Sequence, residues 1–293
     1  MKGKHKMAGL SRKSHLKKKR SLFGKIVECV LLLLLFALFV LPFYYMIISS
    51  FKATIEALRT PPTWWPVRFL WHNFADAWSE ANFTKYGLNS IILSASVVIT
   101  CLACSVPCAF AFARMEFRLK KPLFAIILSD MMVPVQCVFL PLFIMFARLN
   151  WLNTYGSMIV LFTYSGATIF FIRNAFMQVN NEVLEAARLD GASELTVMFR
   201  VTFPMVKPVV VTTALLAFLR RWNDYFWNLS LTTNDSVRTL PYAVQALSAA
   251  TDGAIPRWEI TMAGATMLMA PMLIAYIFAN KQIKSAFIYS GIK

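Results

Sequence analysis

Residues 180–208 read NNEVLEAARLDGASELTVMFRVTFPMVKP, a polar stretch between two long apolar runs. Hydrocarbon rejects such a stretch, because one charged side chain at the centre of a bilayer costs about 2.5–3.5 kcal/mol on insertion scales. The stretch, which we call the elbow, therefore lies in water and separates two membrane-crossing regions. Its charged residues include Glu182, Glu185, Arg188, Asp190, Glu194 and Arg200.

The elbow has the pattern of two short helices joined by a turn. Asn181 can cap the first helix, and Glu182 and Glu185 suit the positive end of its dipole. Asp190-Gly191 then breaks this helix. A second short helix is expected to end at two prolines that lead into the next apolar run. Its apolar residues at i, i+3 and i+4 spacing are Leu195, Met198 and Phe199, and the prolines are Pro204 and Pro208.

The composition places the chain among polytopic membrane proteins. Of 293 residues, 58% are hydrophobic and 15% are charged, and the mean hydropathy is +0.57. We expect a basic cytoplasmic tail over residues 1–23 and one membrane domain over residues 24–293. The net charge of +16 would suggest nucleic-acid binding in a soluble protein. More than half of this excess lies in the tail without an opposing acid, which favours contact with anionic lipid and no nucleic-acid partner.

The order of apolar runs predicts six spans, with both termini on the cytoplasmic side of a cell membrane. The loops after the second and fourth spans are basic or polar, and the loops rich in tryptophan or of balanced charge are expected outside. Pro134 and Pro141 predict a bend in the third span. The spans are expected near residues 26–49, 86–113, 122–146, 155–177, 208–229 and 262–279.

Catalytic and metal-binding patterns are weak in this chain. Cys101-x-x-Cys104-x-x-x-Cys108 has metal-like spacing, but no histidine lies nearby, and helix packing is the favoured interpretation. The three histidines are too scattered to form a catalytic constellation with Ser, Asp or Cys. The sequence contains no G-x-x-x-x-G-K-[ST] motif, so the chain cannot hold ATP phosphates by a P-loop. We therefore expect neither catalysis, nor a metal, nor a cofactor.

The elbow also carries a longer motif, which consists of Glu185-Ala186-Ala187, then Gly191, then Val201-x-Phe203-Pro204. It resembles the EAA loop of permease subunits in bacterial ABC importers, with Val201 and Phe203 in place of the commoner Ile and Leu. The rest of the chain resembles the six-span, maltose-permease-like subunits of carbohydrate importers. The matching segments are Leu88-Asn89-Ser90, Leu149-Asn150-x-Leu152-Asn153-Thr154-Tyr155, Trp222-Asn223-Asp224 and Ser290-Gly291-Ile292-Lys293.

This resemblance implies an all-α integral membrane fold with a cytoplasmic EAA coupling-helix loop between the fourth and fifth transmembrane helices. It implies a permease that forms half of a pore for sugars or oligosaccharides in the bacterial cell membrane. The implied partners are a second homologous permease, two ATPase subunits that supply the energy, and an extracellular solute-binding lipoprotein. The residues expected to couple to the ATPase are Glu185, Ala186, Ala187, Asp190, Gly191 and Pro204.

Charges within the spans mark a candidate substrate path, because such groups must face the bundle interior or an aqueous cavity. Two consecutive arginines depart from the small or polar residues usual in the family, and they would suit an anionic glycan. In the alternative interpretation, one arginine extends to the outer surface and the other pairs with Asp224 or with an acid of a partner subunit. Amide and aromatic groups nearby suit the hydroxyls and ring faces of a sugar. The residues of this path are Trp222, Asn223, Asp224, Trp227, Arg220, Arg221 and Asp130.

Two other functions compete with this interpretation. A secondary transporter driven by an ion gradient would also be polytopic and basic inside, but it would need inverted repeats and a midplane ion site. No convincing internal repeat is present, and the elbow motif would have no role in such a protein. An integral-membrane enzyme would need the catalytic set that the sequence lacks.

Overall fold

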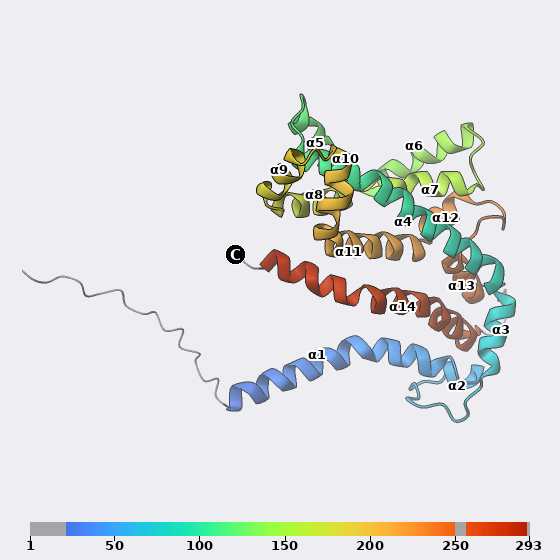
Figure 1. The fold of residues 1–293 in the computed structure, drawn as a ribbon. Helices are drawn as coiled ribbons and strands as arrows, with labels where there is room; N and C mark the ends of the chain where they lie inside the picture. The colour runs from blue at the N-terminus through green and yellow to red at the C-terminus, as the bar shows by residue number, and fades with distance from the viewer. Residues whose placement is uncertain (1–21, 250–255, 292–293) are drawn as a thin grey trace, which may run out of the picture. The chain divides into compact units, whose positions relative to one another are not determined.

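The computed structural model describes residues 22–249 and 256–291, and every regular element within these ranges is a helix (Figure 1). The predicted tail therefore lies almost entirely outside the described residues. The elements are α1 (Leu22–Ser49), α2 (Thr54–Ala57), α3 (His72–Glu80), α4 (Phe83–Arg114), α5 (Lys120–Ser129), η1 (Asp130–Met132), α6 (Val135–Arg148), α7 (Tyr155–Thr163), α8 (Gly166–Gln178), α9 (Asn181–Leu189), α10 (Glu194–Thr196), η2 (Val197–Thr202), α11 (Phe203–Trp222), α12 (Phe226–Leu231), α13 (Leu240–Ala249) and α14 (Trp258–Gly291).

The chain divides into two compact units, residues 1–45 and residues 46–293. The described part of the first unit is most of α1, whose apolar side chains are almost all exposed. A bilayer would cover such a helix, because its length and hydropathy suit a membrane span. The second unit contains all the other helices and the elbow.

Four helices are long and apolar enough to cross a membrane, and two bent pairs raise this number to six if each pair is one span. The pairs are α5–η1 with α6, bent by 100°, and α7 with α8, bent by 42°. The first bend lies at Val133, whose extended ψ of 118° is the conformation that a following proline favours. The bend predicted from Pro134 is therefore present. The four single helices are Lys25–Ser49, Phe83–Arg114, Glu194–Trp222 and Trp258–Ala286.

The fifth span differs from its prediction at both ends. The second elbow helix is not separate, because α10, η2 and α11 form one continuous helix from Glu194 to Trp222. The π-helical turn η2 makes this possible, since the Thr202 hydroxyl donates to the carbonyls of Val197 at 3.1 Å and Met198 at 3.0 Å. At the other end the helix stops at Trp222 rather than near residue 229, and α12 follows as a separate element.

The elbow is anchored in a hydrophobic core rather than attached by a flexible linker. Leu184 of α9 and Met198 of η2 are buried together with Phe110 of α4, Phe176 of α8 and Val206 of α11. Two further cores lie around Trp222 and Trp227. The first core therefore joins the elbow to α4, α8 and α11 by direct packing.

Candidate functional site

The first elbow helix begins one residue earlier than predicted. Asn180, not Asn181, is the N-cap, and its side-chain oxygen accepts a hydrogen bond from the Glu182 N–H at 3.1 Å. Asn181 is the first residue of α9, and its side-chain oxygen accepts a hydrogen bond from Arg114. Two adjacent asparagines make this boundary ambiguous in sequence.

Arg114, the last residue of α4, connects the end of α8 to the start of α9 and so fixes the direction of α9. Its guanidinium donates from Nε to the Phe176 carbonyl at 3.0 Å, and its terminal nitrogens donate to the carbonyls of Phe176 and Val179 and to Asn181. The carbonyls at the end of a helix have no partner within the helix, so the arginine satisfies the end of α8. We refer to this set of bonds as the Arg114 clamp.

The turn after α9 is a Schellman motif. The Ala192 N–H bonds the Ala187 carbonyl at 3.0 Å, and the Gly191 N–H bonds the Arg188 carbonyl at 3.0 Å. Gly191 has a φ of +79°, which is the left-handed conformation expected for it, and Asp190 is the C-cap. No atom lies within 4 Å of the position that a Cβ on Gly191 would occupy. The glycine is therefore required by the backbone conformation and faces open space in this subunit.

An ion pair bridges the turn. Arg188 donates from Nε to Glu194 Oε1 at 2.8 Å and from a terminal nitrogen to Oε2 at 3.1 Å. The hydrogen bond with Glu194 raises the pKa of Arg188, and the charges of Glu194 and Glu185 act in the same direction. The pair is partly exposed, so its contribution to stability is small.

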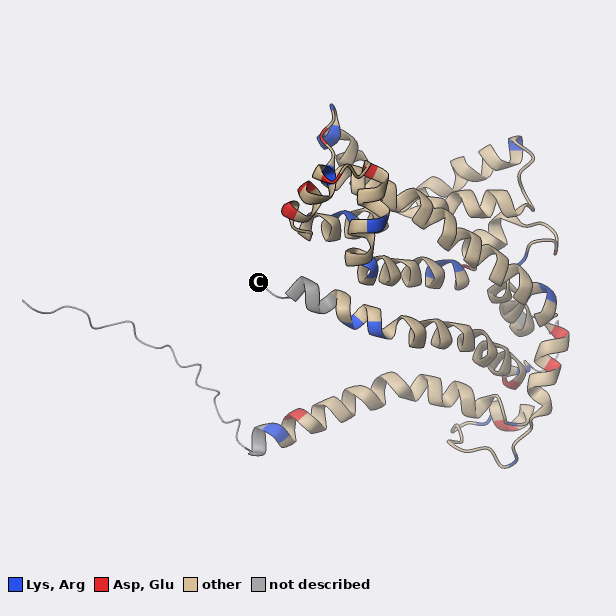
Figure 2. Ribbon diagram, viewed as in Figure 1, with Lys and Arg blue, Asp and Glu red and all other residues tan. Residues whose placement is uncertain are grey.

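The outer surface of the elbow combines charges with exposed apolar side chains, and Figure 2 shows the charged residues gathered there. Glu185 and Ala186 are exposed, and Ala187 is half-buried. Leu189 is 88% exposed and Leu195 is 68% exposed, which is unusual for large apolar residues in water. Of the apolar stripe predicted for the second helix, only Met198 is buried. A polar cleft of 320 Å³ adjoins this surface and is lined by Ala113, Arg114, Glu116, Asn181, Leu184, Glu185 and Arg188.

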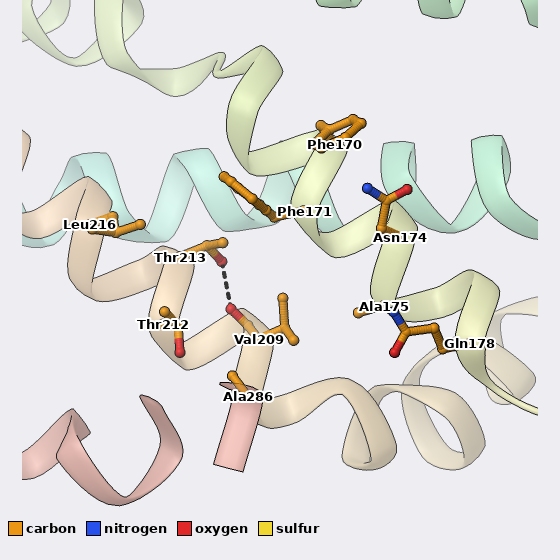
Figure 3. Close-up of a pocket in the computed structure, with 10 residues that line it drawn as sticks. All are labelled: Phe170, Phe171, Asn174, Ala175, Gln178, Val209, Thr212, Thr213, Leu216 and Ala286. Atoms are coloured by element: carbon orange, nitrogen blue, oxygen red, sulfur yellow. Dashed lines mark hydrogen bonds between the residues drawn. The ribbon is translucent and has the colours of Figure 1, made fainter. Parts of the chain in front are cut away.

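A groove runs between α8 and α11, starting near the elbow. Its largest part is a pocket of 460 Å³, where side chains of α8 and α11 face each other and Ala286 of α14 lies beside Val209 (Figure 3). Two smaller pockets, of 200 Å³ and 170 Å³, share lining residues with it and extend it in both directions. We call the three together the α8–α11 groove. Its polar side chains are Asn174, Gln178, Asn180, Tyr164, Ser165, Thr168, Thr212, Thr213 and Arg220.

Of the two consecutive arginines, Arg221 is buried and forms an ion pair within the chain. Its side chain is 0% exposed and forms an ion pair with Asp224, whose side chain is 9% exposed. The other oxygen of Asp224 accepts a hydrogen bond from the Trp227 N–H at 3.2 Å, at the start of α12. This pair stabilises the break between α11 and α12. Arg220 is exposed and lines the groove, so the two arginines have different environments.

The other residues of the predicted path occupy three different settings. Trp222 is 2% exposed and donates from Nε1 to the Leu268 carbonyl at 3.1 Å, and Trp227 is 6% exposed in a separate core. Asn223 is exposed, and its amide bonds the Leu219 carbonyl at 3.0 Å. Asp130 is exposed at the bend before α6 and accepts a hydrogen bond from the Gly166 N–H at 3.3 Å.

Sequence reasoning missed most residues that line the groove. Asn174 and Gln178 lie on one face of α8, and Thr212 and Thr213 lie on α11. The spacing of four residues between Asn174 and Gln178, in a span that is otherwise apolar, is the signal that could have found them.

The fold and the elbow define a class: a polytopic, all-helical membrane permease with a core-anchored loop exposed at one end. Residues 105–287 match the family described as binding-protein-dependent transport system inner membrane component, and the chain belongs to this family. It is thus a permease component of a binding-protein-dependent ABC importer and an inner-membrane protein, and nothing supports the ion-coupled alternative.

Relatives and solved structures match most of the chain. The diacetylchitobiose uptake system permease protein NgcG of Streptomyces coelicolor is 29% identical over 88% of this chain and 85% of its own length. The arabinooligosaccharides transport system permease protein AraQ of Halalkalibacterium halodurans is 28% identical over 87% and 91%. A subunit of a bacterial ABC transporter that imports the acidic polysaccharide alginate has the same fold, with a TM-score of 0.78 at 23% identity over 89% of this chain and 96% of that chain.

Proposed function

We propose that this chain imports sugars or oligosaccharides as one half of a pore, with a second homologous permease forming the other half. Two separate ATPase subunits supply the energy, and an extracellular solute-binding lipoprotein delivers the substrate. The observation that carries the proposal is the elbow, whose outer surface is exposed while its inner surface is buried in the core of α4, α8 and α11. The names of the relatives, which transport diacetylchitobiose and arabinooligosaccharides, support a sugar substrate.

The elbow is the contact with the ATPase. Exposed Leu189 and Leu195 supply apolar surface, and Glu185 at the polar cleft supplies a carboxylate for a basic group. Ala186, Ala187 and Gly191 have small side chains or none, so a partner can approach the backbone closely. Asp190 is the C-cap of α9, and Pro204 lies in the first turn of α11. Closure of the ATPase pair moves the elbow, and the shared core carries this movement to α4, α8 and α11. In the competing interpretation, Glu185 only complements the dipole of its own helix.

The substrate path follows the α8–α11 groove and continues to Asn223. The groove offers the amides of Asn174 and Gln178, the hydroxyl of Thr212 and the rings of Phe170 and Phe171. These groups suit the hydroxyls and apolar faces of a sugar. The buried residues Trp222, Asp224, Trp227 and Arg221 hold the shape of this region, and Asp130 holds the bend that faces α8.

A single substitution tests the coupling role. Gly191→Asp meets no neighbouring atom, and it strains the left-handed turn less than most residues would, because aspartate visits this conformation more readily than they do. It should lower both uptake and the ATPase activity stimulated by the loaded binding protein, while the subunit stays in the membrane. The control is Ser79→Asp, an exposed position on α3. Normal stimulation by the Gly191→Asp importer would refute the proposal.

A further inference from the structure

Arg220 has an unusual position in the α8–α11 groove. It is the one charged side chain among the described residues that line the groove. It is exposed, and within residues 22–249 and 256–291 no carboxylate forms an ion pair with it. The groove therefore contains a positive charge with no compensating negative charge of its own.

Three other arginines of the membrane helices have partners within the chain. Arg221 pairs with Asp224, and its guanidinium carbon lies 5.2 Å from the centre of the Phe162 ring. Arg173 donates to the Phe112 carbonyl at 3.0 Å. The Arg114 clamp uses the guanidinium of Arg114 in the same way. Arg220 differs from these three because its side chain is directed to the groove that it lines.

A guanidinium without a counter-charge inside a membrane span is stabilised by water and by a bound anion. Arg220 lies 12 residues along the helix from Pro208, where the predicted span begins, or about 18 Å at 1.5 Å per residue in a hydrocarbon core of about 30 Å. A charge facing lipid there would be expensive, whereas a charge facing an aqueous path is tolerated and attracts negative solutes. The planar guanidinium fork binds carboxylates in a bidentate manner, which a neutral hydroxyl cannot reproduce.

The rest of the groove suits the remainder of an extended glycan. From Val209 to Arg220 the groove follows 11 residues of α11, or about 16 Å. Amides and hydroxyls lie along this length, and Phe171 contributes an apolar ring to two of the three pockets. The neutral part of the groove can therefore bind sugar rings while Arg220 binds one charged group at its end.

We propose that the transported glycan carries an acidic group and that Arg220 binds this group inside the groove. The inference rests on the proposed function and makes its substrate class specific. It also gives the two consecutive arginines separate tasks, with Arg221 structural and Arg220 in contact with substrate.

The test compares uptake of charged and neutral glycans by the complete importer. Two sets of proteoliposomes are compared, one of zwitterionic lipid alone and one that also contains anionic lipid, with the binding protein added on the outside. Both sets are given radiolabelled uronate trisaccharides and their carboxyl-reduced neutral counterparts. Arg220→Gln should lower uptake of the accepted uronate about tenfold or more, and Arg220→Lys should lower it less. The matched control is Arg148→Gln, an exposed arginine at the end of α6 that lies outside the elbow and does not line the groove. It should leave uptake within about twofold of wild type.

The possible results separate this inference from the proposed function. Uptake of neutral glycans alone would overturn the inference, and so would equal uronate uptake by wild type and Arg220→Gln. Neither result would contradict the proposed function as a sugar importer. Failure of the wild-type importer to take up any glycan would overturn both. If Arg220→Gln instead separates the two permeases on size-exclusion chromatography, the anion is a carboxylate of the second permease, and the inference is wrong. A loss that appears only with anionic lipid would identify a lipid headgroup and would equally overturn it.

Discussion

Asp130 and Gly166 join the two broken spans at their breaks. The Asp130 carboxylate accepts a hydrogen bond from the Gly166 N–H at 3.3 Å, and the Ile127 carbonyl lies 2.5 Å from the position of a Cβ on Gly166. The Tyr164 hydroxyl donates to the same Ile127 carbonyl at 3.0 Å. The sequence placed Asp130 on the substrate path, but its carboxylate is bonded to the first turn of α8. A carboxylate at this end of a helix complements the helix dipole.

We expect Gly166→Ala to destabilise the subunit. Its methyl group would meet backbone, so the helices must separate, at a cost of about 1–3 kcal/mol. Gly156→Ala is the control, because its nearest neighbour would be the Thr154 hydroxyl at an ordinary 3.8 Å. Thermal unfolding of the purified subunit in detergent measures both. Equal melting temperatures for the two variants would show that the bends are not in close contact.

The buried pair of Arg221 and Asp224 gives a second prediction. Asp224→Asn leaves a buried guanidinium without its counter-charge, so we expect a loss of about 3–5 kcal/mol. The double variant Arg221→Met with Asp224→Leu removes both charges and should recover most of this loss. Thermal unfolding again provides the measurement. A double variant as unstable as Asp224→Asn would mean that the helix break needs the ion pair itself.

The sequence predicts the spans and the elbow turn because both depend on strong local signals. Long apolar runs mark the helices, and Asp190-Gly191 marks the left-handed turn. The end of α11 was placed too late because only two polar residues, Asn223 and Asp224, separate Trp222 from the aromatic residues of 225–227, and the break itself is made by the pairing of Arg221 with Asp224.

The groove was harder to predict than the elbow for a related reason. A motif such as Glu185-Ala186-Ala187 is contiguous in sequence, whereas the groove combines single side chains from separate helices. Arg220 was recognised because a charge in an apolar span is rare. Asn174 and Thr212 are small polar residues that many membrane helices contain, and their common location depends on how α8 packs against α11.

The ion pair across the Gly191 turn should be insensitive to pH over the physiological range. The pKa of Arg188 is raised, so the contribution of its charge is complete below its ordinary pKa and is lost only as the pH rises through the raised value. We expect Glu194→Gln to cost less than about 1 kcal/mol, with the same loss at about pH 6 and about pH 9. Exchange of the two residues, Arg188→Glu with Glu194→Arg, should restore part of the lost free energy of unfolding. A loss that differed between the two pH values would show that another titrating group stabilises the turn.

The positions of basic residues predict the topology. Single cysteines near Lys120, Glu185 and Lys284 should be labelled only after the membrane is opened, and those near Trp65 and Arg148 should be labelled in intact cells. The reagent must be unable to cross the membrane, and the background must lack the five native cysteines. Labelling of position 185 from outside would contradict the six-span arrangement. The same experiment extends to Lys19 inside and Asp252 outside, which lie beyond the described residues.

The last prediction concerns the Arg114 clamp, which holds α9 against the ends of α4 and α8. Arg114→Ala removes the donor to the Val179 carbonyl, at about 1–3 kcal/mol for a buried acceptor, while the Phe176 carbonyl keeps its hydrogen bond from the Val179 N–H at 3.2 Å. Arg114→Lys can satisfy one of these acceptors but cannot reproduce the fork. We expect α9 to lose its fixed direction in both variants, so that the ATP hydrolysed per molecule imported rises in the order wild type, Lys, Ala.

Two measurements distinguish lost positioning from general unfolding. Hydrogen exchange should speed up in residues 180–191 while the core of α11 stays protected, and the ratio of hydrolysis to uptake should rise in the assembled importer. Arg118→Ala is the matched control, since Arg118 is an exposed arginine four residues beyond the clamp. Wild-type exchange in the elbow of Arg114→Ala would mean that the hydrophobic core around Leu184 is sufficient to orient α9.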